Sequence, residues 1–385
     1  MRGHLRERSP GHWAIVITVP DANGVKRRKW HSFKGSKREA QRECARLIAE
    51  ISKGSYVEPS KTSLAEFLDR WLEAIKPRVW PRTHERYGEL ARKNIVPLLG
   101  SVMLVKLRPE QIAAAYSEAL SAGRSDGSGG LSPRTVHHLH RVLKQALGHA
   151  VRWQLLLRNP CDAVDPPKVE RAPLHVLDVE GTAEMLETAR GTSLFIPILL
   201  GLTTGMRRGE IVALRWKNVD LDASRLSVIE SAEQTGAGVR YKPPKNGKTR
   251  AVAMPSTLVE ELRAHRKRQM EDRLKLGMRL ADKDFVVAQF DGAPLQPRSL
   301  THAFEKFLAK HDLPHIRLHD LRHSHATAML SAGIHPKVAQ ERLGHSSVSV
   351  TIDLYSHVMP GMQEEAAARV DAALQDAIHR RRGCK

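Results

Sequence analysis

Two breaks in the residue pattern, at residues 53–60 and 159–167, divide this chain of 385 residues into three segments. The second break contains Asn159-Pro160 and Asp165-Pro166-Pro167, and turn-forming residues of this kind interrupt helices and strands. A chain of this length also exceeds what one hydrophobic core usually organises. We therefore predict three domains, over residues 1–58, 59–166 and 167–385.

The first segment changes from a strand pattern to a helical pattern. Residues 12–19 are rich in β-branched and aromatic types, and they end at a cluster of turn-forming residues at 20–24. A second strand is expected through Trp30 and Phe33. From Ser36 onward, apolar residues recur at helical spacing, with Ser36 as a possible N-cap. The segment is predicted to be a small β-sheet followed by one helix.

The middle segment is helical in pattern, and the third segment mixes helices with strands. Amphipathic helices are expected over 64–75, 83–95 and 109–120, and another from Ser132-Pro133 through Leu147. In the third segment, helices are expected over 178–190, 193–204, 210–214, 256–275, 298–311, 319–332, 335–342 and about 348–354, and strands over 226–230 and 249–254. The predicted fold class is multidomain, mainly α with α+β parts.

Positive charge is spread over the whole chain. Lys and Arg number 62 against 42 Asp and Glu, which gives a formal charge of +20. Lys and Arg outnumber Asp and Glu by 13 to 6 in 1–58, by 16 to 10 in 59–166, and by 33 to 26 in 167–385. A localisation signal would concentrate the charge in one short run. The distribution favours a long polyanionic partner, with nucleic acid as the first candidate.

Cysteine spacing and hydropathy indicate a cytoplasmic protein without a membrane partner. Cys44, Cys161 and Cys384 are far apart, which predicts neither a disulfide framework nor a zinc site. The most apolar run, 194–202, is about half the length that crosses a bilayer and contains Pro197. No signal-peptide pattern is evident at the N-terminus.

Four separated motifs in the third segment carry the candidate chemistry. They are Thr204-Gly205-Met206-Arg207-Arg208-Gly209-Glu210-Ile211, Leu318-His319-Asp320-Leu321-Arg322-His323, Leu343-Gly344-His345-Ser346 and Thr351-Ile352-Asp353-Leu354-Tyr355. Each residue taken singly also has a non-catalytic interpretation. Arg207 could be an ordinary surface charge, and Tyr355 could be a partly buried tyrosine. His319 and His323 have the spacing of a zinc pair, but the Glu of a His-Glu-x-x-His motif is missing and Arg322 would place a cation beside the metal.

Together and in this order, the motifs resemble the active site of the tyrosine recombinase, or phage integrase, family. The resemblance covers about residues 174–360 by motif and the two preceding segments more loosely by architecture. It implies an N-terminal arm-type DNA-binding domain, a helical SAM-like core-binding domain and a mixed α/β catalytic domain. The catalytic residues that it implies are Arg207, His319, Arg322, His345 and Tyr355.

The family resemblance also implies a catalytic lysine in a β-hairpin. Residues 242–250 contain Lys242, Lys245 and Lys248. The family position at the opening of the turn corresponds to Lys245, with Lys248 as the alternative. Alternatively, both lysines could be non-catalytic residues of a solvated turn.

The residue types suit phosphodiester chemistry. Attack on a phosphodiester gathers negative charge on the non-bridging oxygens, which the planar guanidinium groups of Arg207 and Arg322 would bind, with His345 as a further donor. Tyr355 must lose a proton whose free pKa is about 10, and His319 is the candidate base. Lys245 would protonate the leaving 5′-oxygen. No nucleotide-binding loop or acidic metal cluster is evident, so neither a cofactor nor a metal is predicted.

The resemblance implies a site-specific recombinase that integrates or excises a mobile element, such as a prophage, through a 3′-phosphotyrosyl intermediate. It implies double-stranded DNA as substrate, a homotetramer assembled on DNA, and accessory DNA-bending and directionality proteins. Residues 362–378 carry an apolar stripe at helical spacing, which would pack on a neighbouring protomer or on its own domain. A type IB topoisomerase and a non-catalytic DNA-binding regulator are the alternative functions.

Overall fold

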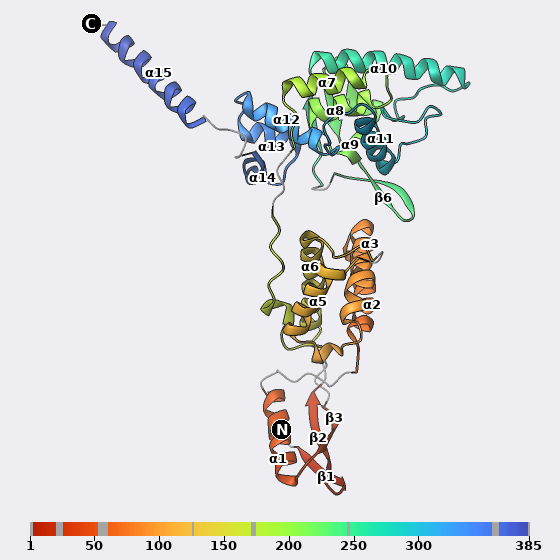
Figure 1. The fold of residues 1–385 in the computed structure, drawn as a ribbon, viewed down its shortest axis with the longest axis vertical. Helices are drawn as coiled ribbons and strands as arrows, with labels where there is room; N and C mark the ends of the chain where they lie inside the picture. The colour runs from red at the N-terminus through yellow and green to blue at the C-terminus, as the bar shows by residue number, and fades with distance from the viewer. Residues whose placement is uncertain are drawn as a thin grey trace. The chain divides into compact units, whose positions relative to one another are not determined.

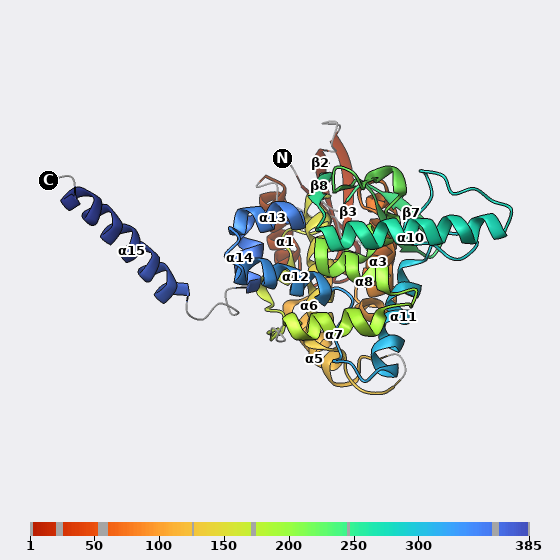
Figure 2. The ribbon, with the colours of Figure 1, turned by 90° about the horizontal axis from the view of Figure 1, so that it is seen from above.

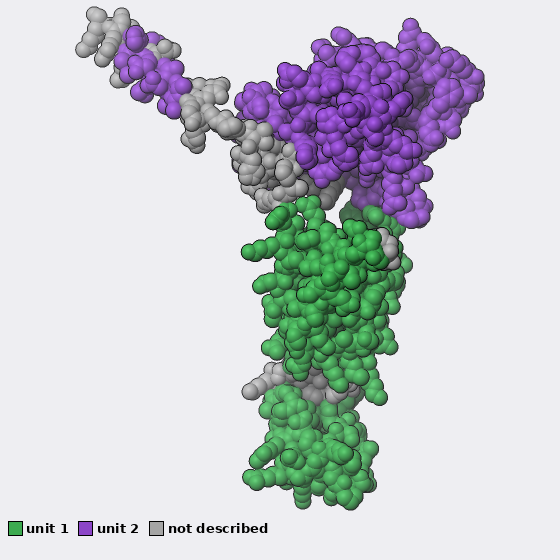
Figure 3. Space-filling model, in the orientation of Figure 1, with its two compact units in different colours: residues 1–171 green, residues 172–385 purple. Residues whose placement is uncertain are grey.

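A computed structural model describes residues 3–20, 26–52, 61–124, 127–170, 175–244, 247–355 and 362–383. The chain forms two compact units, residues 1–171 and 172–385 (Figure 3). The first unit contains two separate buried clusters, one within residues 15–51 and one within residues 64–164. The three-domain division stays a prediction that this arrangement supports. The predicted linker at 53–60 lies outside the described residues.

The N-terminal part is a three-stranded antiparallel sheet covered by one helix (Figure 1). Its elements are β1 (His4–Ser9), β2 (His12–Pro20), β3 (Lys26–Lys34) and α1 (Lys37–Ser52). Ile15 and Ile17 of β2 are fully buried with Leu47 of α1. Strand β1 was not predicted from the sequence, because this edge strand is polar and mostly exposed and so lacks an apolar alternation.

The face of this sheet opposite the buried isoleucines is basic. Arg6 pairs with Ala14, and Trp30 pairs with Val16, so these side chains project away from the Ile15 face. Arg28 lies on the same open face, opposite Thr18. Trp30 is 55% exposed, and the Arg8 guanidinium lies 5.8 Å from its ring centroid. The open face therefore combines cationic side chains with an exposed aromatic ring.

The middle part is a helical bundle around Phe67 and Trp71, both fully buried. It comprises α2 (Leu64–Ile75), η1 (Lys76–Arg78), α3 (Pro81–Leu90), a π-helical turn η2 (Ala91–Ile95), α4 (Val96–Leu99), η3 (Leu104–Lys106), α5 (Pro109–Ala122), α6 (Pro133–Arg152) and η4 (Pro160–Ala163). Assigning Asn159-Pro160 to a linker was wrong, because η4 starts at Pro160 and its Cys161 is fully buried in this core.

The second unit is built around α8 (Phe195–Thr204), which is buried along most of its length. Its other helices are α7 (Val179–Ala189), α9 (Arg208–Ala213), η5 (Trp216–Asn218), α10 (Ser256–Lys275), α11 (Pro297–Lys310), α12 (Asp320–Ser331), α13 (Pro336–Leu343), α14 (Val348–Tyr355) and α15 (Met362–Gly383). Figures 1 and 2 both show α12, α13 and α14 side by side. None of the helices in the described parts of the chain is long and apolar enough to span a bilayer.

Two small β-structures lie between α9 and α10. A three-stranded sheet contains β4 (Val219–Asp220), β5 (Arg225–Val228) and β8 (Arg250–Ala253), and a separate hairpin contains β6 (Ser231–Thr235) and β7 (Gly238–Lys242). Strands β5 and β8 were predicted from the sequence, and β6 and β7 between them were not. The β6–β7 hairpin was missed because its strands carry polar residues without a clear apolar alternation. The hairpin that the family resemblance implied around residues 242–250 differs from the structure, because β7 ends at Lys242 and β8, which begins at Arg250, belongs to the other sheet.

Candidate active site

Both predicted catalytic arginines bind backbone carbonyls at the end of α13, and the two carbonyls belong to consecutive residues. Arg322, in the first turn of α12, is 2% exposed and donates from Nη1 to the Gly205 carbonyl at 2.6 Å and from Nη2 to the Leu343 carbonyl at 2.7 Å. Arg207, immediately before α9, donates from Nη2 to the Gly344 carbonyl at 3.1 Å. The last carbonyls of a helix lack partners within the helix and carry partial negative charge. The end of α13 therefore fixes two cations that are distant in the sequence.

Glycines in the left-handed conformation form the turns that supply these carbonyls. Gly205 follows α8 with φ 65°, and Gly344 follows α13 with φ 64°. A Cβ at position 205 would lie 2.5 Å from the Leu343 side chain, and one at 344 would lie 3.2 Å from Arg250. Both the positive φ and the close packing favour glycine at these two positions.

A buried carboxylate links Arg207 to a further arginine, Arg250. Glu210, on α9, is 1% exposed; its carboxylate accepts from Arg207 Nη1 at 3.0 Å and from the Arg207 backbone N–H at 2.9 Å. The same carboxylate accepts two bonds from Arg250, at 3.1 and 2.7 Å. Burial by itself would raise the pKa of Glu210, but the hydrogen bonds and charge of Arg250 and the charge of Arg207 outweigh it and lower the pKa. The carboxylate is therefore ionised at neutral pH.

Two histidines lie beside the arginines and are neutral at pH 7. Burial, followed by the charges of Arg322 and Arg207, lowers the pKa of His345 to about 3. The His319 side chain reaches solvent, yet surrounding protein displaces water from much of its ring. This desolvation, with the neighbouring His323 and the two arginines, lowers the pKa of His319 to about 4. Each neutral imidazole therefore has one ring N–H that can donate a hydrogen bond and one ring nitrogen that can accept one.

Hydrogen bonds and ring packing orient these imidazoles. His345 Nδ1 lies 2.9 Å from the hydroxyl oxygen of Thr351, a fully buried residue of α14. The ring centroids of His319 and His323 are 5.0 Å apart in an edge-to-face arrangement. Among the described residues, no group of three or more His, Cys, Asp and Glu side chains has an arrangement that would hold a metal ion.

Of the last two predicted residues, the structure describes Tyr355 in part and Lys245 not at all. Tyr355 is the final residue of α14, one helical turn after Thr351, and its side chain lies outside what the structure describes. Lys245 lies outside the described residues altogether. The alternative, Lys248, is described and exposed. Lys242 of β7 instead forms an ion pair with Glu233 of β6, and both side chains are largely buried.

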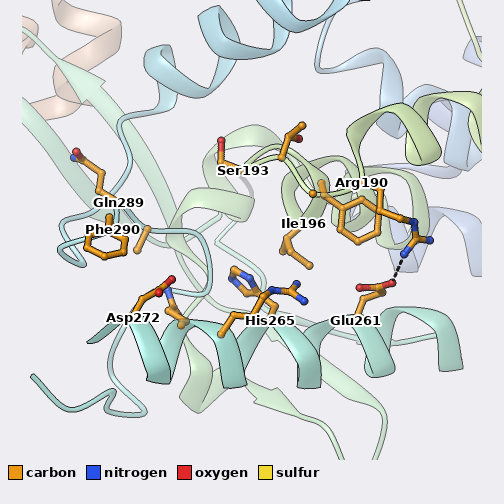
Figure 4. Close-up of a pocket in the computed structure, with 14 residues that line it drawn as sticks. Arg190, Ser193, Ile196, Glu261, His265, Asp272, Gln289 and Phe290 are labelled. Carbon is orange, nitrogen blue, oxygen red and sulfur yellow. Dashed lines mark hydrogen bonds and ion pairs between the residues drawn. The ribbon is translucent and has the colours of Figure 1, made fainter. Parts of the chain in front are cut away.

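A pocket of about 530 Å³ elsewhere in this unit contains none of the six predicted residues. It lies between α10 and the segments around Ser193 and Phe290 (Figure 4). Arg190 and Glu261 form an ion pair of 2.8 Å at its edge. The candidate chemistry is therefore at the end of α13 and not in this cavity.

The sequence matches two family models. Residues 177–361 match the model described as phage integrase family, and residues 63–120 match the phage integrase N-terminal SAM-like domain. The ICEBs1 integrase of Bacillus subtilis is 30% identical over 248 residues, which cover 64% of this chain and 67% of that protein. The chain belongs to the phage integrase family of tyrosine recombinases. It is a tyrosine-type site-specific recombinase, as the integrases of mobile elements are.

Longer alignments and solved structures agree with this membership. A tyrosine recombinase XerC-like protein of Caldanaerobacter subterraneus is 27% identical over 379 residues, which cover 92% of this chain and 94% of the relative. The Tn1549 transposon integrase in complex with circular intermediate DNA has a similar fold, with a TM-score of 0.67 at 20% identity over 80% of this chain and 99% of that one. A lambda integrase tetramer bound to a Holliday junction gives a TM-score of 0.55 at 19% identity, over 90% and 96% of the two chains.

Arg250 of the recombinase was not predicted from the sequence as part of the site. A signal was present, because the strand alternation puts Arg250 on the same face as the buried Val252 and Met254, whereas Ala251 and Ala253 are exposed. A charged residue at an inward position requires a partner. Its partner, Glu210, is remote in the sequence, so the pattern alone did not identify the pair.

Proposed function

We propose that the recombinase cleaves and rejoins double-stranded DNA through a 3′-phosphotyrosyl intermediate, with Arg207 and Arg322 as a clamp on the scissile phosphate. The observation that carries this proposal is the binding of these two guanidinium groups to the adjacent Leu343 and Gly344 carbonyls. Anchored in this way, the two cations are held before DNA binds, which is the preorganisation that electrostatic catalysis requires. A guanidinium has five N–H donors, so Arg207 retains donors for phosphate beyond its bonds to Glu210 and Gly344.

The histidines and the tyrosine take complementary roles in this proposal. A neutral His319 accepts the proton that Tyr355 loses as its oxygen attacks phosphorus. We assign the Thr351 hydroxyl as the donor to Nδ1, so that the ring proton of His345 lies on Nε2 and donates a hydrogen bond to a phosphate oxygen. Residues four apart in a helix share a face, so position 355 follows Thr351 along the side of α14 that faces His345. The released 5′-oxygen takes a proton from Lys245.

An experiment with a modified substrate can show whether Lys245 or Lys248 is the general acid. A 5′-bridging phosphorothiolate releases a thiolate, which leaves without protonation. Lys245→Ala is expected to lose most activity on normal DNA and to recover it on the sulfur substrate. Lys242→Ala is the matched control, because this lysine is already paired with Glu233 and no rescue by sulfur is expected. Rescue at Lys248 would move the role there, and absence of rescue at either lysine would remove the general acid from the mechanism.

The functional assembly that we propose is a homotetramer on two DNA duplexes, which integrates or excises a mobile element. The lambda integrase tetramer on a Holliday junction supports this by its fold. Val370 and Leu374 of α15 are 68% and 59% exposed, which leaves apolar surface for packing on a neighbouring protomer or on the same chain. Accessory bending and directionality proteins would assist the exchange.

The N-terminal sheet is proposed as a second DNA-binding site that holds an accessory sequence. Its open face presents Arg6, Arg28 and Trp30, which suits contact with phosphates and base edges in a major groove. One chain would then hold an accessory site through residues 1–58 and the crossover site through the rest. The alternative is that this domain adds only non-specific phosphate affinity.

Strand exchange between two duplexes tests both the recombinase function and the assignment of two DNA sites to separate parts of the chain. The full-length protein is expected to join two duplexes carrying complete sites in excess EDTA, because no step proposed here needs a metal. A protein beginning at Thr62 is expected to cleave crossover-site DNA but to lose integration, since bivalent binding is lost. Within the full-length protein, Arg28→Ala should weaken accessory-site footprints, whereas Arg38→Ala, an exposed residue of α1, should not.

Three results would count against these assignments. Plasmid relaxation without joining would indicate a topoisomerase, and absence of any covalent adduct would indicate a DNA-binding regulator. Normal integration by the truncated protein would remove the accessory-site role. Footprints should be compared at matched salt, because phosphate contacts depend strongly on ionic strength.

A further inference from the structure

Arg250 is a buried arginine that binds Glu210, the carboxylate partner of Arg207, although it is not one of the six predicted catalytic residues. It is the first residue of β8, and its side chain is 9% exposed. Its three guanidinium nitrogens bind two different elements: Nη1 and Nη2 donate to Glu210 of α9, and Nε donates to the Arg342 carbonyl of α13 at 2.8 Å. The side chain thus ties β8 to both elements that hold the clamp.

Three arginines occupy three consecutive carbonyls at the end of α13. Arg250 binds the carbonyl of residue 342, Arg322 that of residue 343, and Arg207 that of residue 344. The next residue is His345. A shift of this turn would therefore move the acceptors of both clamp arginines and the histidine at once.

Arg250 also sets the charge around Arg207. With the ionised Glu210 as its only neighbour, Arg207 would have much of its charge neutralised and its guanidinium drawn toward the carboxylate. Arg250 binds both carboxylate oxygens, so the cluster of two cations and one anion retains one positive charge. That remaining charge is available to a phosphate.

We propose that Arg250 is a positioning residue for phosphodiester cleavage: it neutralises Glu210 and anchors the Arg342–Gly344 turn, so that Arg207 and His345 are held in place for the scissile phosphate. This rests on the proposed clamp function of Arg207. Arg250 itself need not touch DNA.

The test measures single-turnover cleavage of a nicked suicide substrate at saturating DNA, alongside DNA affinity and thermal melting. Arg250→Gln is expected to slow cleavage about 100-fold, the size of effect that follows loss of an oxyanion donor, with little change in DNA affinity. Arg250→Lys should remain slow, because an ammonium group cannot reproduce the fork that binds both carboxylate oxygens and the carbonyl. Arg215→Gln is the matched control. It removes another part-buried arginine that pairs with a glutamate, Glu230, and with a backbone carbonyl in the same unit.

A second substitution separates positioning from simple structural support. Glu210→Gln added to Arg250→Gln removes the unbalanced negative charge and keeps one side-chain oxygen as an acceptor for Arg207, so the cleavage rate should recover about tenfold relative to Arg250→Gln alone. A residue needed only for folding would give no such recovery, because the double variant lacks both charged partners. The recovery should appear in the cleavage rate constant and not in DNA affinity.

Each outcome has a defined meaning. Cleavage by Arg250→Gln at the rate of Arg215→Gln would overturn the proposal. A lowered melting temperature of Arg250→Gln, with no recovery of the cleavage rate in the double variant, would also overturn it. Arg207→Lys is run in parallel: if that variant cleaves normally, the clamp itself fails. If Arg207→Lys is inactive while Arg250→Gln is normal, only the role of Arg250 fails.

Discussion

Tyr355→Phe is expected to abolish covalent attachment of the protein to a nicked suicide substrate, because the substitution removes only the oxygen that attacks phosphorus. DNA affinity should be nearly unchanged, since phosphate contacts from basic side chains supply most of the binding. The measurement is the fraction of protein that becomes covalently attached to labelled DNA after denaturation, with affinity determined separately at the same salt concentration.

Tyr241→Phe is the matched control for this experiment. Tyr241 lies in the same unit, on β7, and its ring stacks on Phe285 with centroids 5.3 Å apart. The control variant should form the adduct at the normal rate. An adduct that persists in Tyr355→Phe, or one lost equally in both variants, would contradict the assignment of the nucleophile.

Arg322→Lys is expected to reduce cleavage by a factor on the order of 10²–10³ although it preserves the charge. An ammonium group is a point cation and lacks the planar fork with which Arg322 binds the Gly205 and Leu343 carbonyls simultaneously. Arg207→Lys should show a comparable loss, since its guanidinium also bridges two acceptors. The rate constant should be measured at saturating DNA, so that a change in affinity does not enter the comparison.

A buried arginine outside the site provides the control for the Arg322 variant. Arg273 of α10 is 6% exposed and donates to the Asp291 carbonyl at 2.7 Å. Arg273→Lys therefore makes the same substitution at another buried arginine without contacting the clamp. It should lower the melting temperature but leave the cleavage rate constant nearly unchanged. Near-normal cleavage by both clamp variants would exclude a guanidinium clamp.

Local sequence patterns predicted most helices because a helix needs only side chains three or four residues apart. The expected helix over 256–275 has the same bounds as α10, and the expected strands at 226–230 and 249–254 correspond to β5 and β8. The strand β1 and the β6–β7 hairpin were not predicted, since these polar strands depend on pairing with a neighbour and lack an apolar alternation of their own.

The sequence by itself determined the residue types and order of the candidate site, because Arg207, the His319 and Arg322 pair, His345 and Tyr355 lie in motifs that are readable without coordinates. The tertiary structure decided how the cations are held. The Arg250–Glu210 pair and the binding of three arginines to the Arg342–Gly344 turn join segments that are distant in the chain. The physical reason is that burial removes the water around a charge, so a buried charge is stable only beside protein groups that replace this water. Folding brings those groups from elsewhere in the sequence.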